Sequence, residues 1–164
     1  MRLILLVAAV LMGVGAAGGA RAQSDNVIDY SADDAAMNAA IREAQATLPV
    51  FWRRVGDEGV RHPAVKVALD ADSGAVEHIW VAEVRSQGTG FAGVLINEPR
   101  DIRALRAGSP VIFDADRITD WTYEFKGRLW GGHTLRVMLP DIPKADAAEL
   151  RQYLSDTPLE PASR

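Results

Sequence analysis

The sequence predicts an α+β domain in which an antiparallel sheet of about five strands is packed by an N-terminal helix and a C-terminal helix. Three observations support this prediction. Apolar residues have helical spacing near both ends of the chain, strand-like alternation fills the middle, and short polar loops join successive strands. Short loops favour antiparallel neighbours, because parallel strands need long crossover connections.

The first 22 residues have the pattern of a signal peptide. Arg2 begins a positive segment, residues 3–14 are apolar, and Ala20-Arg21-Ala22 fits the small-x-small cleavage rule. We therefore expect cleavage between Ala22 and Gln23 and a periplasmic or secreted mature protein. An uncleaved membrane anchor is the alternative, but the apolar run is short and no stop-transfer segment follows, so we expect no stable membrane insertion after cleavage.

Composition limits the classes of partner. Without the 22-residue leader, 142 of the 164 residues remain, with 16 basic residues against 22 acidic ones and a net charge of −6. This charge disfavours nonspecific binding to nucleic acid or anionic lipid. The chain has no cysteine, which excludes disulfides, acylated lipoproteins and thiolate catalysis. The length suits a single domain with its own core.

After a polar lead-in at residues 23–30, we expect the domain to occupy residues 31–155 and to begin with a helix. Ser31 and Asp34 have the spacing of a capping box. Pro49 interrupts the apolar stripe, which keeps its phase on both sides. The sequence therefore predicts either a kinked helix or two abutting helices, the second capped by Thr47. The apolar stripe consists of Met37, Ile41, Ala44, Leu48, Phe51 and Val55.

Strands are predicted at residues 64–69, 76–84, 91–96, 111–113 and 118–125. In the second, His78 and Trp80 point to one face and Ile79 to the other, and neither face is purely polar. We expect a central strand covered on both sides, with Glu77 near its entrance and His78 as a half-buried structural residue. In the last strand, Trp121 belongs to an aromatic face that we assign to the core.

The C-terminal part contains one short segment whose type the sequence leaves open. Residues 134–139 suit a final strand or a short helix capped by Thr134, and we favour the helix. A terminal helix is predicted to begin at Pro143, with Ala147, Leu150 and Leu154 on its buried side. We expect residues 156–164 to form a frayed tail.

Several motifs, dispersed in order along the chain, resemble the YegJ-like family of bacterial domains of unknown function. The resemblance covers roughly residues 34–154. One departure is His133, where the family pattern has an aromatic such as tyrosine. The resemblance implies an α+β domain, alone or after an export signal, and no established activity. The matching positions are Glu77, His78, Trp80, Asn97-Glu98-Pro99, Asp120-Trp121, Gly132, Thr134 and Arg136.

The sequence contains no recognisable cofactor, metal or nucleophile motif. His78 and His133 lack metal-ligand spacing, and no HExxH or repeated Asp-x-Asp pattern occurs. The serines lack a Gly-x-Ser-x-Gly context, and no glycine-rich phosphate loop is present. We therefore predict no cofactor, no metal and no catalytic residues.

What remains is a set of polar residues at the ends of neighbouring strands. Two carboxylates at a suitable separation would permit hydrolysis of an envelope glycan, and Arg136 could pair with one of them. Structural pairing is the simpler interpretation. We therefore predict a noncatalytic periplasmic binding or protective, immunity-like module, acting on an unknown protein or small envelope ligand. The alternative is a small envelope hydrolase that uses Glu77 or Glu98 with Asp120. The candidate cluster comprises Glu77, His78, Asn97, Glu98, Asp120 and Arg136.

Overall fold

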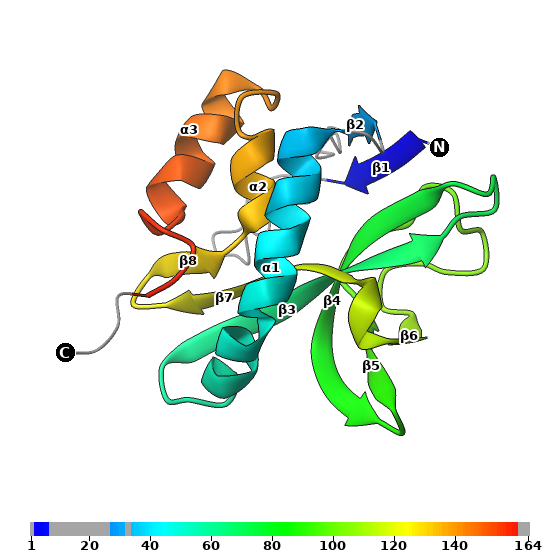
Figure 1. Cartoon of the computed structure of the whole chain (residues 1–164), viewed down its shortest axis with the longest axis horizontal. Helices are drawn as coiled ribbons and strands as arrows, with labels where there is room; N and C mark the ends of the chain where they lie inside the picture. Colours follow the sequence, from blue (N-terminus) through cyan, green and yellow to red (C-terminus); the bar gives the residue numbers. More distant parts are fainter. Residues whose placement is uncertain (1, 7–26, 32–33, 161–164) are drawn as a thin grey trace, which may run out of the picture.

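The computed structural model describes residues 2–6, 27–31 and 34–160, which form an α+β fold (Figure 1). Its centre is an antiparallel sheet of six strands with helices on both faces. The strands are β3 (Val60–Asp70), β4 (Val76–Gln87), β5 (Gly90–Leu95), β6 (Pro110–Phe113), β7 (Ile118–Phe125) and β8 (Arg128–Gly131). The predicted fold class is confirmed.

Two further strands lie in the N-terminal part. β1 (Arg2–Leu6) pairs antiparallel with β2 (Val27–Ser31) and parallel with Val76–His78 of β4. Residues 1–22 were expected to lie outside the fold, whereas β1 belongs to the sheet. The expected cleavage point between Ala22 and Gln23 lies outside the described residues. A processed chain would keep β2 and lose β1.

Helix α1 (Ala35–Arg54) is one continuous helix that contains Pro49. Its N-cap is Asp34, whose carboxylate accepts a hydrogen bond from the Met37 amide (2.7 Å). The predicted helix start at Ser31 is wrong, because Ser31 ends β2. Thr47 does not cap a second helix either. Its hydroxyl instead donates to the carbonyl of Glu43, one turn back (2.7 Å).

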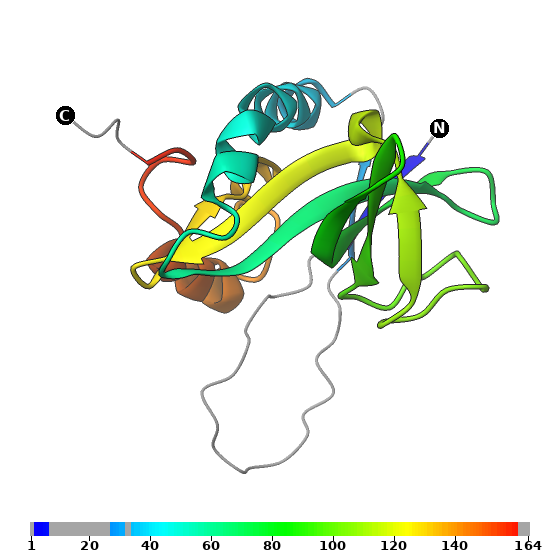
Figure 2. The same ribbon diagram turned by 90° about the horizontal axis from the view of Figure 1, so that it is seen from below.

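The predicted apolar stripe explains where α1 lies. Buried residues recur every three or four positions and face β3, β4 and β7, so that α1 covers one face of the sheet (Figure 2). Trp121 and Tyr123 of β7 are fully buried on that face, which confirms the predicted aromatic core face. The buried positions of the helix are Met37, Ala40, Ala44, Leu48 and Phe51.

The opposite face is covered by the C-terminal helices α2 (His133–Met138) and α3 (Lys144–Tyr153). Leu135 and Leu154 pack there against Trp80 of β4. Residues Glu77–Val81 of β4 are all buried, which confirms a central strand covered on both sides. The preference for a helix over residues 134–139 is also confirmed.

Two features of the C-terminal part differ from the sequence-based expectation. β8 lies outside the predicted strands, because four residues are too few for a strand pattern. The expected frayed tail packs on the sheet as far as Glu160, whose carboxylate accepts from the Tyr123 hydroxyl (2.6 Å) and from Arg54 (2.9 Å). Gly131, the last residue of β8, has a φ of 77°, and a side chain there would collide with the carbonyl of Trp121.

Candidate functional site

Three of the predicted site residues serve the loop between β5 and β6. The Glu77 carboxylate is fully buried and accepts from the amides of Arg100 (2.8 Å) and Asp101 (3.1 Å). Glu98 accepts from the amide of Ala107 (3.0 Å). Asn97 is buried close by in sequence, with its Oδ1 atom unpartnered. Glu77 and Glu98 therefore accept hydrogen bonds from loop amides in place of water, and Asn97 lies next to Glu98 in the sequence.

His78 is more deeply buried than expected, with only 3% of its surface exposed. Its Nδ1 atom lies 2.9 Å from the Thr119 hydroxyl, and its Nε2 atom has no partner. Burial lowers the pKa of His78 to about 3, and the positive charges of Lys66 and Arg117 act in the same direction. The ring therefore stays neutral over the physiological range.

Asp120 is fully buried and ties β7 to the start of α2. Its Oδ1 atom accepts from the amides of Trp121 (2.8 Å) and His133 (3.0 Å). Its Oδ2 atom accepts from the amide (2.8 Å) and the hydroxyl (2.6 Å) of Thr134. Because Gly132, the N-cap of α2, has no side chain, Asp120 performs the capping role from a neighbouring strand.

Lys66 is not among the predicted site residues, yet it completes a buried hydrogen-bonded series with Thr134 and Asp120. Its ammonium donates to the Thr134 hydroxyl (2.7 Å) and lies 4.9 Å from the centre of the Trp80 ring. Burial lowers the pKa of Lys66 to about 8, while the charge of Asp120 acts in the opposite direction. One sequence signal pointed to this arrangement: Lys66 shares its strand face with Ala64 and Ala68, which indicates a covered surface.

Arg136 is occupied elsewhere. Its guanidinium donates to the carbonyl of Gly131 (3.2 Å) and to the backbone and hydroxyl oxygens of Ser155 (2.9 and 3.0 Å). It thereby fastens α2 to the chain that follows α3. The six predicted residues therefore do not form one cluster. Glu77, Asn97 and Glu98 lie at the β5–β6 loop, His78 and Asp120 lie on strands β4 and β7, and Arg136 lies beside Ser155.

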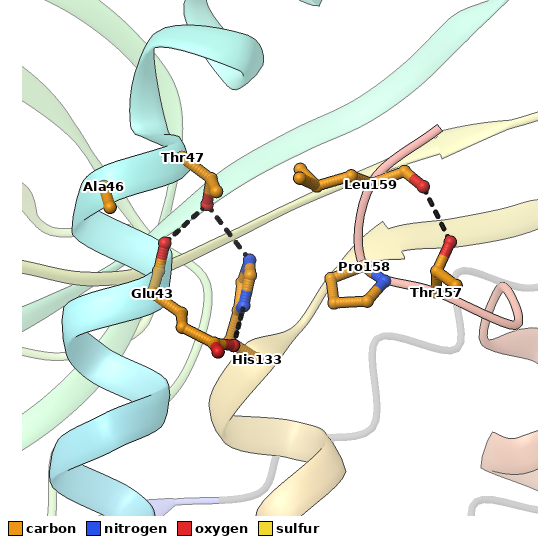
Figure 3. A pocket seen from close by; sticks show the side chains of 7 residues that line it. All are labelled: Glu43, Ala46, Thr47, His133, Thr157, Pro158 and Leu159. Atoms are coloured by element: carbon orange, nitrogen blue, oxygen red, sulfur yellow. Dashed lines mark hydrogen bonds and ion pairs between the residues drawn. The ribbon is translucent and has the colours of Figure 1, made fainter. Parts of the chain in front are cut away.

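A cleft of about 440 Å³ opens between α1 and the C-terminal segment (Figure 3). The His133 ring forms part of its wall and is held between two residues one turn apart on α1. Its Nε2 atom lies 3.2 Å from the Thr47 hydroxyl, and its Nδ1 atom lies 3.6 Å from the Glu43 carboxylate. Trp121 packs edge-on against the same ring. The cleft is lined by Glu43, Ala46, Thr47, His133, Thr157, Pro158 and Leu159.

His133 lines the cleft, unlike the six predicted site residues. Only 4% of the residue is exposed, yet its Nδ1 atom has no hydrogen-bond partner. The Glu43 side chain beside it is 73% exposed. Within the residues that the structure describes, no group of three or more His, Asp or Glu side chains has the arrangement of a metal site. The charged side chain in the cleft wall is the exposed Glu43 carboxylate.

Comparisons with known proteins agree with the resemblance seen in the sequence. A family described as "Uncharacterized protein conserved in bacteria (DUF2314)" matches residues 34–155. The chain is 30% identical to the uncharacterized protein YegJ of Escherichia coli K12 over 154 residues, which cover 94% of this chain and 99% of that protein.

A second relative is a putative ankyrin repeat protein of Neisseria meningitidis serogroup B, strain MC58. It is 30% identical over 135 residues, which cover 76% of this chain. The match covers 53% of that protein, so the chain spans about half its length. No solved structure matches the chain.

Proposed function

We propose that this chain, which belongs to the DUF2314 family of uncharacterised bacterial proteins, is an exported and noncatalytic binding or protective module. The observation that best supports the proposal is a contrast between two kinds of polar group. The buried carboxylates are occupied by the protein's own donors, whereas the exposed Glu43 carboxylate and the His133 ring line an open cleft.

The carboxylates are poorly suited to acid–base catalysis. A catalytic pair must share a substrate-sized space and hold different pKa values. Glu77 and Glu98 contact amides of the β5–β6 loop, while Asp120 contacts the start of α2 on another element. The backbone hydrogen bonds of each carboxylate account for its presence without a catalytic role. The small envelope hydrolase is therefore the weaker alternative.

The export part of the proposal rests on the leader-like sequence of residues 1–22. In the part of the chain that the structure describes, no helix is long and apolar enough to cross a membrane. The acidic mature chain suits an envelope ligand or protein partner better than nucleic acid.

The binding site that we assign to this function is the cleft beside His133. The test is a titration of the isotopically labelled mature protein with small-molecule fractions of an envelope extract. We expect resonances of residues 43–47, His133 and residues 157–159 to shift together. Ala46→Phe, which fills the cleft mouth, should abolish the shifts. Ala39→Phe, at another exposed position of α1, should retain them.

A separate assay tests the hydrolase alternative with peptidoglycan fragments. We expect no turnover by the purified wild-type protein. If the wild type cleaves these fragments, and Glu98→Gln and Asp120→Asn remain folded but lose turnover, then the noncatalytic proposal is wrong. Circular dichroism and thermal melts establish whether the two variants are folded.

A further inference from the structure

The two edges of the six-stranded antiparallel sheet differ in what covers them. At the β8 edge, the C-terminal segment bonds to the strand, since the Ser155 amide donates to the Leu129 carbonyl (2.9 Å) and Leu129 forms a parallel bridge with Leu154. At the opposite edge, β6 pairs only with β5 among the residues that the structure describes (Figure 1). An uncovered edge strand is a template for pairing with another chain.

The outward backbone groups of β6 belong to alternate residues. The Ser109 carbonyl accepts from the Leu95 amide (3.0 Å), so Ser109 turns its carbonyl toward β5. Counting from Ser109, every second residue of an antiparallel strand turns its N–H and C=O away from that neighbour. These outward residues are Pro110, Ile112 and Asp114, the last of which is still extended, with φ −88° and ψ 160°. Pro110 suits such a position, because it has no N–H to give to β5.

The side chain of Ile112 is exposed beside this edge. It is 69% accessible, and no other large hydrophobic residue is exposed within residues 34–160. Its neighbours Val111 and Phe113 are buried in the core that α1 covers, so the alternation along β6 places Ile112 on the other face. Covering an exposed isoleucine is favourable, which makes this edge apolar as well as unpaired.

Charges of opposite sign flank β6. Arg106 precedes the strand, whereas Asp114 and Asp116 follow it, and all three residues are exposed. Between described residues, none of the three takes part in an ion pair. An antiparallel arrangement of two β6 strands would place the basic end of each beside the acidic end of the other. Such charge complementarity favours a second copy of this chain as the occupant of the edge.

We propose that two copies of the chain associate through β6, antiparallel to each other about a two-fold axis at Ile112. The Ile112 residues then exchange both of their outward hydrogen bonds, and the Asp114 amide of each copy donates to the Pro110 carbonyl of the other. The remaining position needs no bond. Pro110 has no N–H, and the Asp114 carbonyl that it would face already accepts from the Arg117 amide (3.1 Å). The edge is therefore complementary to itself, as a closed two-fold interface requires.

This interface is separate from the cleft beside His133, so the two proposals are tested independently. Sedimentation equilibrium of the purified protein measures the association. We expect the mean mass to rise from that of a monomer at about 10 µM toward that of a dimer at about 1 mM, the weak range that a small interface supports. A wild-type protein that remains monomeric throughout would overturn the proposal.

Ile112→Lys places two like charges side by side at the axis and should weaken association at least about tenfold. Thr89→Lys, at an exposed position of the β4–β5 turn, is the matched control and should associate like the wild type. Because the Ile112 side chain is exposed, the variant should keep the wild-type circular dichroism spectrum. A dimer that Ile112→Lys leaves unchanged would use another surface and would overturn the assignment to β6.

Charge reversal tests the antiparallel direction. Arg106→Glu should weaken association, and the double variant Arg106→Glu with Asp116→Arg should restore it, because the two ends are again opposite in sign. In the wild type, the amides of Ile112 and Asp114 should exchange with solvent more slowly in the dimer than in the monomer, while the Thr89 amide should not change. Failure of the double variant to recover, or equal exchange of these amides in both states, would overturn the proposed pairing.

Discussion

At the scale of single residues, the buried polar chain from Lys66 through Thr134 to Asp120 is the most demanding feature of the fold. Each member is fully buried, and each satisfies the next by a hydrogen bond. Charges removed from water are tolerated only when they are paired and hydrogen-bonded. These hydrogen bonds join β3 to β7 through the start of α2, and they hold the three elements together.

Replacing Asp120 with asparagine should destabilise the protein by about 3 kcal/mol, because Lys66 then loses its compensating charge in a buried site. Chemical denaturation measures this change in the free energy of unfolding. Asp116→Asn, at an exposed position just before β7, should change stability by less than about 0.5 kcal/mol. Similar losses in both variants would contradict a special role for Asp120.

Lys66 should make stability rise with pH between about 8 and 10. Its pKa is about 8 in the folded protein and 10.5 ordinarily, so the unfolded chain binds more protons in this interval. Stability then increases by up to about 1.4 kcal/mol per pH unit. Below pH 8 both states are protonated, and the full cost of burying the charge is present.

The measurement compares denaturation of the wild type with that of Lys66→Met, which keeps the aliphatic stem. The rise between pH 8 and 10 should be absent from the variant. Burial raises the pKa values of Tyr123 and Tyr153 to about 12, and their hydrogen bonds to carboxylates act in the same direction, so both weaken folding above pH 10. Their effect cancels in the comparison. Parallel curves for the two proteins would show that Lys66 does not titrate as a buried group.

At the scale of elements, the two faces of the sheet are buried for different reasons. The α1 face contains an aromatic core around Trp121, which stacks on Tyr123. The opposite face contains Trp80, the lysine-centred polar chain and the apolar side chains of α2 and α3. A strand in the middle of such a sheet has no face exposed to solvent. Polar side chains on that strand are therefore hydrogen-bonded to other groups of the protein.

Truncation of the buried indoles should therefore be costly on both faces. Trp80→Ala and Trp121→Ala should each destabilise the protein by about 3 to 5 kcal/mol, since each leaves a large cavity. Trp130 is only partly buried, and Trp130→Ala should lower the unfolding midpoint much less. Thermal melts of the three variants make the comparison. Equal and small effects would mean that the faces of β4 and β7 are assigned wrongly.

At the scale of the whole molecule, cleavage of the N-terminal segment decides whether the mature protein contains β1. β1 pairs with the first residues of β4, yet it lies inside the predicted signal peptide. Processing would remove β1, the partner of β2, and leave the six-stranded antiparallel sheet with α1, α2 and α3. None of the residues that line the His133 cleft belongs to the segment that would be removed.

Export gives a direct prediction for the whole chain. Expressed in a Gram-negative host, the protein should be recovered from the periplasm with Gln23 as its first residue, and its intact mass should correspond to loss of residues 1–22. An Ala20→Lys and Ala22→Lys double variant should block cleavage and keep the protein with the membrane fraction. A soluble cytoplasmic product that retains Met1 would contradict the predicted localisation.

The sequence alone determined the α+β class, the order of most elements and the buried aromatic positions. These properties depend on local periodicity, as in the stripe of α1 and the alternation of β7. It also indicated the family, through polar residues whose types and order are recognisable without a structure.

Only the tertiary structure decided what those polar residues do. Glu77, Asp120 and Arg136 bind backbone groups that lie up to 24 positions away in the sequence, and no local pattern specifies such partners. The His133 cleft was equally hidden, because Glu43 and Thr47 of α1 reach the ring only when α1 packs beside α2. Periodicity determines which face of an element is buried, whereas long-range packing determines which side chains meet there.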